Sequence, residues 1–172
     1  EWLREEKITI YHSVPTVFRR FAATLSGKED FPQLRVANLT GETLLSQDVE
    51  AFRKHFPDSC VLVNGLGATE VGTFREFRID SKTVVAEGVV PVGKAVEGTD
   101  VLLLDNHGNE VEPGQVGQIV VRGEHISPGY WKRPDLTRAC FLSGEDAGER
   151  RMYRTGDLGQ LLPDGSLLHL GR

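Results

Sequence analysis

The sequence predicts an α/β fold in two parts: a layer of parallel strands with crossover helices, followed by a small, distorted antiparallel β-barrel. The first part is indicated by β-branched runs that alternate with helical apolar stripes up to about residue 78. The second is indicated by short strands separated by turn residues. We therefore predict a division into residues 1–78 and 79–172, without a flexible linker.

The elements of the first part alternate between strand and helix. Ile8–Ile10 is a β-branched run, and Pro15 suits the start of a helix, where its missing N–H would have no partner anyway. Apolar residues recur at helical spacing from Val17 to Leu25, and Gly27 ends this helix. The further elements are a strand over Leu34–Leu39, a helix over Gln47–Phe56 and a strand over Cys60–Val63. Strands joined by helices in this order predict parallel pairing.

The second part is rich in turns. A turn cluster at Asp105–Asn109 separates two predicted strands, and Pro163-Asp164-Gly165 between apolar runs indicates a hairpin. The predicted strands cover residues 101–104, 118–121, 159–162 and 166–170. Short strands joined by tight turns predict an antiparallel barrel or sandwich.

Composition excludes several classes of partner. The net charge is −5 and no block of Lys or Arg occurs, which argues against nucleic acid or a membrane surface. No apolar run approaches the about 18 residues of a membrane span. Cys60 and Cys140 are too few and too far apart for a disulfide framework or a zinc cluster, so we expect reduced thiols and a cytoplasmic protein. The five histidines lack metal-ligand spacing.

One candidate site is the segment Asn64–Glu70, which follows a predicted buried strand, where α/β sheets place their ligands. Gly65 and Gly67 allow a close backbone approach, Thr69 can bond a phosphate oxygen, and Glu70 can hold a divalent cation. The alternative is a glycine-containing turn without a ligand. The sequence has no P-loop, and the third glycine of a dinucleotide fingerprint is missing.

A second candidate site is Tyr153–Leu158, which mixes an aromatic, a cation, a hydroxyl and a carboxylate. An ionised Asp157 accepts hydrogen bonds only, so it suits a ribose diol; the alternative is a turn carboxylate that caps the barrel. Thr40-Gly41-Glu42 lies between a strand and a helix, where Thr40 or Glu42 could serve only as a cap. Ser13, Ser59 and Ser127 lack a nucleophile-elbow setting. Together these segments indicate a nucleotide site with parts outside this chain.

Taken in order, the motifs resemble the adenylate-forming superfamily, and within it the adenylation domains of nonribosomal peptide synthetases. The match over Tyr153–Leu158 is complete. The matching segments are Val14-Pro15-Thr16, Thr40-Gly41-Glu42, Asn64–Glu70, Gly117–Tyr130 continuing through Arg133–Thr137, and Tyr153–Arg172. The resemblance implies that the parallel layer belongs to the N-terminal core of such a domain and that the barrel is its small subdomain.

The resemblance also implies a two-step reaction. An amino acid or other small carboxylic acid attacks the α-phosphate of ATP, in the presence of Mg²⁺, to give an acyl-adenylate and pyrophosphate. The phosphopantetheine thiol of a carrier-protein domain then takes the acyl group. The catalytic C-terminal domain of the family would follow Arg172, so the isolated chain is expected to be inactive.

The family pattern assigns roles to residues. Asp157 would hold the ribose hydroxyls, with Arg172 assisting. The catalytic residues would be Thr69, at the α-phosphate, and Glu70, as the Mg²⁺ ligand. Further nucleotide contacts would come from Thr40, Gly41 and Glu42 beside the adenine, and from Asn64, Leu66 and Gly67. The acyl pocket would be lined by Asn38, Thr40, Gly65, Thr73 and Phe74.

The chain departs from the family pattern at four positions. Leu66 replaces a tyrosine that stacks on adenine, Ala68 a proline, Thr40 a glycine and Gln118 a glutamate. Two alternatives therefore stay open: an acyl- or aryl-CoA ligase of the same superfamily, and a non-catalytic domain that retains the fold. The sequence leaves the choice between an amino acid and a plain carboxylic acid open.

Overall fold

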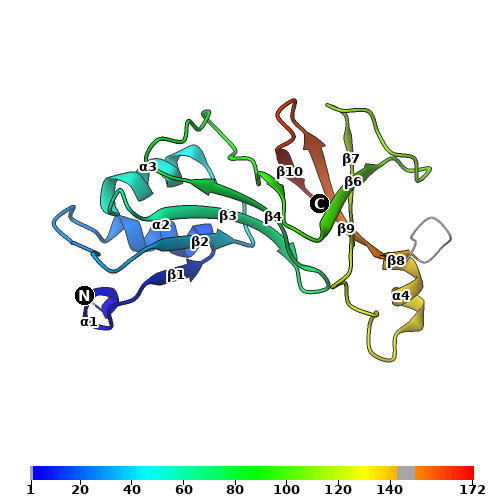
Figure 1. Cartoon of the computed structure of the whole chain (residues 1–172), viewed down its shortest axis with the longest axis horizontal. Helices are drawn as coiled ribbons and strands as arrows, with labels where there is room; N and C mark the ends of the chain where they lie inside the picture. The colour runs from blue at the N-terminus through cyan, green and yellow to red at the C-terminus, as the bar shows by residue number, and fades with distance from the viewer. Residues whose placement is uncertain (1, 143–149) are drawn as a thin grey trace. The chain divides into compact units, whose positions relative to one another are not determined.

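The computed structural model describes residues 2–142 and 150–172 (Figure 1). Contacts divide the chain into two compact units. The first unit comprises the residues up to Gly65 and Phe77–Pro91, and the second comprises Leu66–Glu76 and Val92–Arg172. The chain passes between the units three times, after Gly65, after Glu76 and after Pro91, and for this reason each unit contains two segments. The assignment of residues 1–78 and 79–172 to subdomains of a larger core stays a prediction.

The first unit contains the parallel layer (Figure 1). Its helices are α1 (Trp2–Glu5), α2 (Pro15–Ala23) and α3 (Ser46–His55), and its strands are β1 (Ile10–Ser13), β2 (Val36–Thr40) and β3 (Val61–Ala68), which runs on into the second unit. Val36 of β2 lies opposite Ile10 of β1 and Val61 of β3, in parallel register on both sides. The predicted strand–helix–strand order is therefore confirmed.

The first strand begins later than predicted. Ile8 belongs to the turn that follows α1, where its N–H donates to the Leu3 carbonyl at 3.0 Å. Lys7 has a φ of 51°, a left-handed conformation that breaks the extended run. The side chain of Ile8 packs against the core all the same, so a β-branched residue here reflects burial rather than a strand.

Helices α2 and α3 are joined by an aromatic core and one ion pair. Phe18 of the predicted apolar stripe is fully buried, whereas Val17 at the start of that stripe is 51 % exposed. Phe52 of α3 is nearly fully buried. The stacked rings of Phe52 and Phe56 have centroids 5.2 Å apart. Arg19 pairs through Nε and Nη2 with both carboxylate oxygens of the buried Asp48, at 2.7 and 2.8 Å. Asp48 also accepts the N–H of Leu45, the N-cap of α3, at 2.8 Å.

Strand β4 (Gly72–Ile79) was not predicted, and it lies next to β3 in the sheet order β1-β2-β3-β4-β5. Strand β5 (Lys94–Ala95) pairs with it in antiparallel fashion. The charged residues of β4 interrupt the alternation of apolar and polar residues that predicts a strand. One of them, Arg75, occupies a buried position and is only 5 % exposed. Its guanidinium donates to the carbonyls of Gly93 and Gly165, at 3.0 and 3.1 Å.

The second unit has the predicted antiparallel architecture. Its sheet has the order β10-β9-β7-β6, with β8 pairing on β9, and forms half of a barrel. The elements are β6 (Thr99–Leu104), β7 (Val116–Gly123), α4 (Pro134–Cys140), β8 (Phe141–Leu142), β9 (Arg151–Leu161) and β10 (Leu167–Gly171). The predicted hairpin turn is present: Gly165 has a φ of 80°, and its N–H donates to the Leu162 carbonyl at 2.9 Å. Fully buried Ile119 and Leu167 belong to the core of this unit.

Strand β9 is longer than predicted and contains the whole Tyr153–Leu158 motif. Gly156 has a φ of 77°, and the register between β7 and β9 shifts between Gln118 and Val120, so the strand is bulged at the motif. A β-bulge re-aims the side chains that follow it, in this case Asp157.

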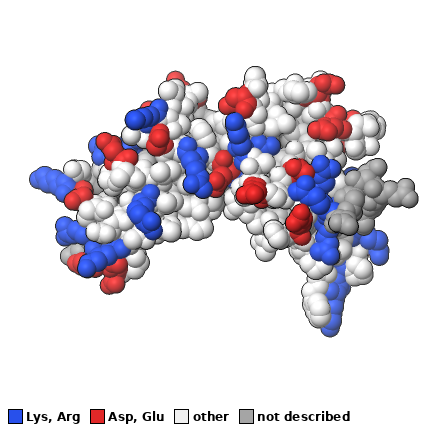
Figure 2. Space-filling model, in the orientation of Figure 1, with Lys and Arg blue, Asp and Glu red and all other residues white. Residues whose placement is uncertain are grey.

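Surface charge is mixed in both units. On the face drawn in Figure 2, Lys and Arg side chains are interspersed with Asp and Glu side chains over each unit. Neither sign covers a unit on that face, which agrees with the small net charge of −5. Among the described residues, no helix has the length and apolar character needed to cross a bilayer.

Candidate functional site

Strand β2 carries two candidate pocket residues. Asn38 lies opposite His12 of β1, and Thr40 lies opposite Gly65 of β3. The Oγ1 of Thr40 is 3.0 Å from the His12 Nε2, while the Oδ1 of Asn38 is buried without a hydrogen-bond partner. The parallel pairing therefore brings Thr40 and Gly65 together at one end of the sheet and leaves Asn38 with an unused acceptor.

Gly41 and Glu42 follow the end of β2, and the Glu42 side chain reaches the start of helix α2. Gly41 has a φ of 85°, which favours glycine. A Glu42 carboxylate oxygen accepts from the N–H and the Oγ1 of Thr16, at 2.9 and 2.6 Å. These hydrogen bonds hold the pKa of Glu42 below its usual range, with Arg19 adding a smaller contribution. In this structure Glu42 satisfies an N–H in the first turn of α2, as a capping residue does.

Asn64 holds the end of the first unit's second chain segment, Phe77–Pro91. Its side-chain amide donates to the carbonyls of Val90 and Pro91, at 3.2 and 2.9 Å, and the residue is 1 % exposed. Both amide hydrogens of Asn64 thus bind backbone. Only its carbonyl oxygen stays available for another donor.

Beyond Gly65 the motif forms a tight hairpin in the second unit. The N–H of Val71 donates to the Ala68 carbonyl at 3.1 Å, which places Thr69 and Glu70 at the tip of the turn. A Cβ on Gly67 would lie 2.7 Å from the Gly72 carbonyl oxygen, so the two strands approach too closely for a side chain there. The hairpin exposes Thr69 and leaves Glu70 half-buried.

The other candidate residues of the hairpin differ in burial. Leu66 and Phe74 are 9 % and 1 % exposed and belong to one apolar cluster. Thr73 is exposed. The structure therefore places the two predicted pocket residues of β4 in different environments, with Thr73 in solvent and Phe74 in the interior.

Glu70 is bonded by a tyrosine from a distant loop. The hydroxyl of Tyr130 donates to the Glu70 Oε1 at 2.6 Å and lies 3.3 Å from the Tyr153 hydroxyl. Burial raises the pKa of Glu70, but the Tyr130 hydrogen bond, the neighbouring Tyr153 hydroxyl and the charge of Arg172 together outweigh it. The net pKa lies below the usual range, so Glu70 is ionised at neutral pH.

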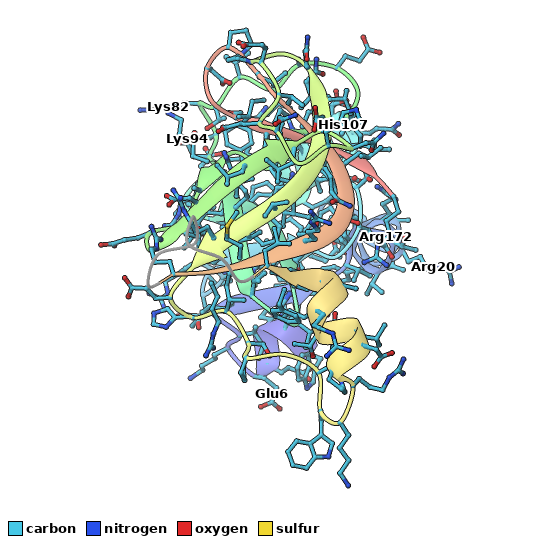
Figure 3. All side chains as sticks on the ribbon, turned by 90° about the vertical axis from the view of Figure 1, so that its right-hand side faces the viewer. Glu6, Arg20, Lys82, Lys94, His107 and Arg172 are labelled. Carbon is cyan, nitrogen blue, oxygen red and sulfur yellow. The ribbon has the colours of Figure 1, made fainter. Side chains whose placement is uncertain are left out.

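Asp157 has partners on both its backbone and its side chain. Its backbone N–H donates to the Thr155 Oγ1 at 3.0 Å, and that hydroxyl donates to the buried Ile119 carbonyl at 2.9 Å. Its Oδ1 lies 2.8 Å from the Arg172 Nε and its Oδ2 lies 3.6 Å from the His169 Nε2. The Arg172 side chain is labelled in Figure 3. The carboxylate side chain is 16 % exposed, whereas Arg172 is 82 % exposed.

The second unit thus brings Glu70, Asp157 and Arg172 into one polar cluster, since the charge of Arg172 acts on both the Tyr153 hydroxyl and Glu70. We call Glu70, Tyr130, Tyr153, Asp157, His169 and Arg172 the carboxylate cluster. No group of three or more His, Cys, Asp or Glu among the described residues could form a complete metal cage. A single ionised Glu70 nevertheless suits Mg²⁺, because this cation is usually bound through one or two carboxylates together with substrate phosphates.

The sequence did not indicate a role for three residues that lie beside the two carboxylates. The Tyr130 ring packs on Phe141, with ring centroids 5.4 Å apart, and its hydroxyl binds Glu70. His169 and Thr155 were not assigned a role. A signal for Tyr130 was available, because a half-buried tyrosine hydroxyl usually has a hydrogen-bond partner.

Comparisons with known proteins identify the family of this chain. A family model described as AMP-binding enzyme matches residues 1–131. Zwittermicin A synthase ZmaJ of Bacillus cereus is 31 % identical over all of this chain, and gramicidin S synthase 2 of Brevibacillus brevis is 32 % identical over the same extent. The chain spans 33 % of the first protein and 4 % of the second.

A solved structure has the same fold. Holo-PA1221, described as a nonribosomal peptide synthetase protein containing adenylation and PCP domains bound to a vinylsulfonamide inhibitor, superposes with a TM-score of 0.84. It is 32 % identical, and the match covers 99 % of this chain and 30 % of that one. The α/β layer, the antiparallel half-barrel and the relatives together show that this chain belongs to the AMP-binding enzyme family, as a part of an adenylation domain of the peptide-synthetase type.

Proposed function

We propose that the chain supplies part of the nucleotide site of an amino-acid-activating adenylation domain. The complete domain would convert ATP and an amino acid to an aminoacyl-adenylate and pyrophosphate, and then load a carrier protein. The observation that carries the proposal is the carboxylate cluster. It contains two acidic side chains of the second unit with different neighbours. Glu70 lies beside two phenols, and Asp157 lies between Arg172 and His169.

Asp157 is assigned to the ribose. An ionised carboxylate has only acceptor positions, and two vicinal hydroxyls can donate to it together. The Thr155 hydroxyl accepts the backbone N–H of Asp157 and donates to the Ile119 carbonyl, so the backbone that carries the carboxylate is held in place before a ligand binds. Arg172 partly neutralises the charge and can turn toward a phosphate or hydroxyl, because most of its side chain is in solvent.

Thr69 and Glu70 are assigned to the phosphates. The exposed Thr69 hydroxyl at the hairpin tip is the group for the α-phosphate, and Glu70 is the ligand for Mg²⁺. When bound, the ion neutralises charge on the phosphates during displacement. The protein residues contribute position: a rigid hairpin, closed by the Val71–Ala68 hydrogen bond, presents both groups in a fixed direction.

The remaining roles follow the family pattern. We assign Thr40, Gly41, Glu42, Asn64, Leu66 and Gly67 to further nucleotide contacts, and Asn38, Thr40, Gly65, Thr73 and Phe74 to the acyl pocket. The buried, unpaired Oδ1 of Asn38 supports a polar contact in that pocket. Phosphopantetheine on a carrier domain is the proposed acceptor, and a cytoplasmic location is proposed with it.

The test is ATP–pyrophosphate exchange by the complete adenylation domain, assayed across amino acids and simple carboxylic acids. Exchange with one amino acid, abolished by Asp157→Ala, is the expected result. Asp58→Ala is the matched control, because Asp58 is an exposed carboxylate in the turn before β3. Exchange only with fatty or aryl acids would replace the proposal with an acyl- or aryl-CoA ligase, and a folded protein that binds no ATP would point to a non-catalytic domain.

A further inference from the structure

We propose that the Tyr130 hydroxyl is a positioning group for Glu70: it fixes the carboxylate in the orientation in which it binds the divalent cation, with Tyr153 supporting Tyr130 from behind. The inference deepens the proposed function and rests on it. Tyr130 would touch neither nucleotide nor metal and would act through Glu70 alone.

The hydrogen bonds have one direction. A phenol carries one proton, and the Tyr130 proton is donated to the Glu70 Oε1 at 2.6 Å. In the 3.3 Å contact between the two hydroxyls, Tyr153 must therefore be the donor and Tyr130 the acceptor. The result is a chain from Tyr153 to Tyr130 to Glu70, in which each hydrogen bond polarises the next toward the carboxylate.

Tyr130 is itself held firmly. Its backbone N–H donates to the Thr137 Oγ1 at 2.9 Å, and the Thr137 hydroxyl donates to the Arg133 carbonyl at 2.9 Å, which ties the loop to the first turn of α4. Gly129 has a φ of 136°, and a Cβ there would lie 2.4 Å from the Thr137 Cγ2, so the loop and α4 are in close contact. The ring packs edge-on against Phe141. The hydroxyl is therefore a fixed point rather than a mobile one.

The same loop holds the backbone of Glu70. The N–H of Ser127 donates to the Glu70 carbonyl at 2.8 Å, three residues before Tyr130. Glu70 thus receives one hydrogen bond on its backbone and one on its side chain from a single loop. A glutamate side chain has three rotatable bonds, so without the Tyr130 contact its carboxylate would sample several rotamers at the hairpin tip.

This arrangement suits a metal ligand. The Tyr130 hydrogen bond occupies one of about four acceptor positions of the carboxylate and leaves the others for the cation and its waters. Hydrogen bonds to ligating carboxylates tune metal binding, and their removal typically lowers metal affinity by about 10–100-fold. Because the donor is a neutral phenol, it orients Glu70 without cancelling the charge that attracts the cation.

The experiment measures ATP affinity of the complete adenylation domain by calorimetry, once with Mg²⁺ and once with EDTA. The dissociation constant with EDTA, divided by the dissociation constant with Mg²⁺, reports the contribution of the metal to ATP binding. In Tyr130→Phe we expect this ratio to fall by roughly 10-fold, with the metal-free affinity unchanged. Tyr153→Phe should lower it less. Tyr11→Phe is the matched control, because the buried Tyr11 hydroxyl has no hydrogen-bond partner and lies in the other unit.

A double-variant cycle separates positioning from a general structural effect. Glu70→Gln should remove most of the metal contribution, and adding Tyr130→Phe to Glu70→Gln should then change nothing further. Additive effects, or equal losses with and without Mg²⁺, would overturn the inference and leave the proposed function standing. A wild-type protein that binds no ATP under either condition would overturn both. If Tyr130→Phe does not fold, Tyr153→Phe decides: an unchanged ratio in that variant would overturn the inference.

Discussion

The Arg172 Nε lies 2.8 Å from the Asp157 Oδ1, although the two side chains differ greatly in exposure, at 82 % and 16 %. Strand β9 and strand β10 place them together, since Gly171 pairs with Leu158 after a register shift. Asp157 is therefore a fixed acceptor and Arg172 a solvent-exposed partner that can change its contacts when a ligand binds.

Asp157→Asn is expected to weaken ATP binding without unfolding the protein. The amide keeps the size of the carboxylate but loses its charge and half of its acceptor capacity. A hydrogen bond to a charged group contributes about 1.5–3 kcal/mol, so the dissociation constant for ATP should rise by roughly 10–150-fold. Calorimetry on the complete domain measures it. Asp58→Asn should leave the constant unchanged, and an equally tight Asp157→Asn variant would remove Asp157 from the nucleotide site.

Asp48→Ala is expected to destabilise the first unit. The substitution removes the partner of Arg19 and the acceptor of the Leu45 N–H at the start of α3. Losing a cap costs about 1 kcal/mol. The loss of the ion pair adds less than the about 3–5 kcal/mol of a fully buried pair, because Arg19 is 40 % exposed and regains water. The expected total is about 2–3 kcal/mol in urea unfolding.

The exposed pair Arg133–Asp135 provides the control for that measurement. Both side chains are 56 % exposed at a distance of 2.7 Å, comparable to the Arg19–Asp48 contact. Exposed pairs contribute about 0–1 kcal/mol, so Asp135→Ala should have little effect. Equal losses for the two variants would show that the burial of Asp48 does not set its contribution.

The sequence predicted the elements that local patterns specify. Apolar spacing located α2, whose Phe18 is fully buried, and turn chemistry located the hairpin at Gly165. Strand β4 was not predicted because its buried Arg75 is held by carbonyls 18 and 90 residues away, to which its Nη1 donates. A charged residue in a strand is compatible with burial only when distant backbone comes to it, and no local pattern reveals that.

The candidate site shows the same limit. Glu70 and Asp157 were predicted to be ligand groups because an ionised carboxylate suits a divalent cation or a ribose diol. The contact between Tyr130 and Glu70 joins residues 60 positions apart and requires both the β3–β4 hairpin and the loop before α4. Such a contact depends on tertiary structure, so the sequence pointed to the two carboxylates as candidates but not to the Tyr130 hydroxyl that binds Glu70.

Gly67→Ala is expected to damage the hairpin more than Gly72→Ala. The added Cβ would lie 2.7 Å from the Gly72 carbonyl oxygen and 3.0 Å from the Thr73 Cα, so backbone must move. At Gly72 a Cβ meets nothing within 4 Å, and the cost is the φ of 70°, about 1 kcal/mol. Thermal unfolding and ATP affinity of both variants measure the difference. A Gly67→Ala variant as stable as Gly72→Ala would show that the two strands can separate without loss.

The two cysteines should differ in reactivity. Burial raises the pKa of the Cys60 thiol to about 11, with the Ala37 hydrogen bond opposing it weakly, whereas Cys140 is half-buried. The thiolate is the reactive form, so at pH 8 a disulfide reagent should modify Cys140 first and Cys60 only on unfolding. A pKa raised in the folded state also means that Cys60 favours folding below the ordinary thiol pKa, and that this contribution is lost as the pH rises toward 11. Cys140→Ser should abolish the fast phase and Cys60→Ser the slow one, and a fast phase that persists in Cys140→Ser would contradict the burial of Cys60.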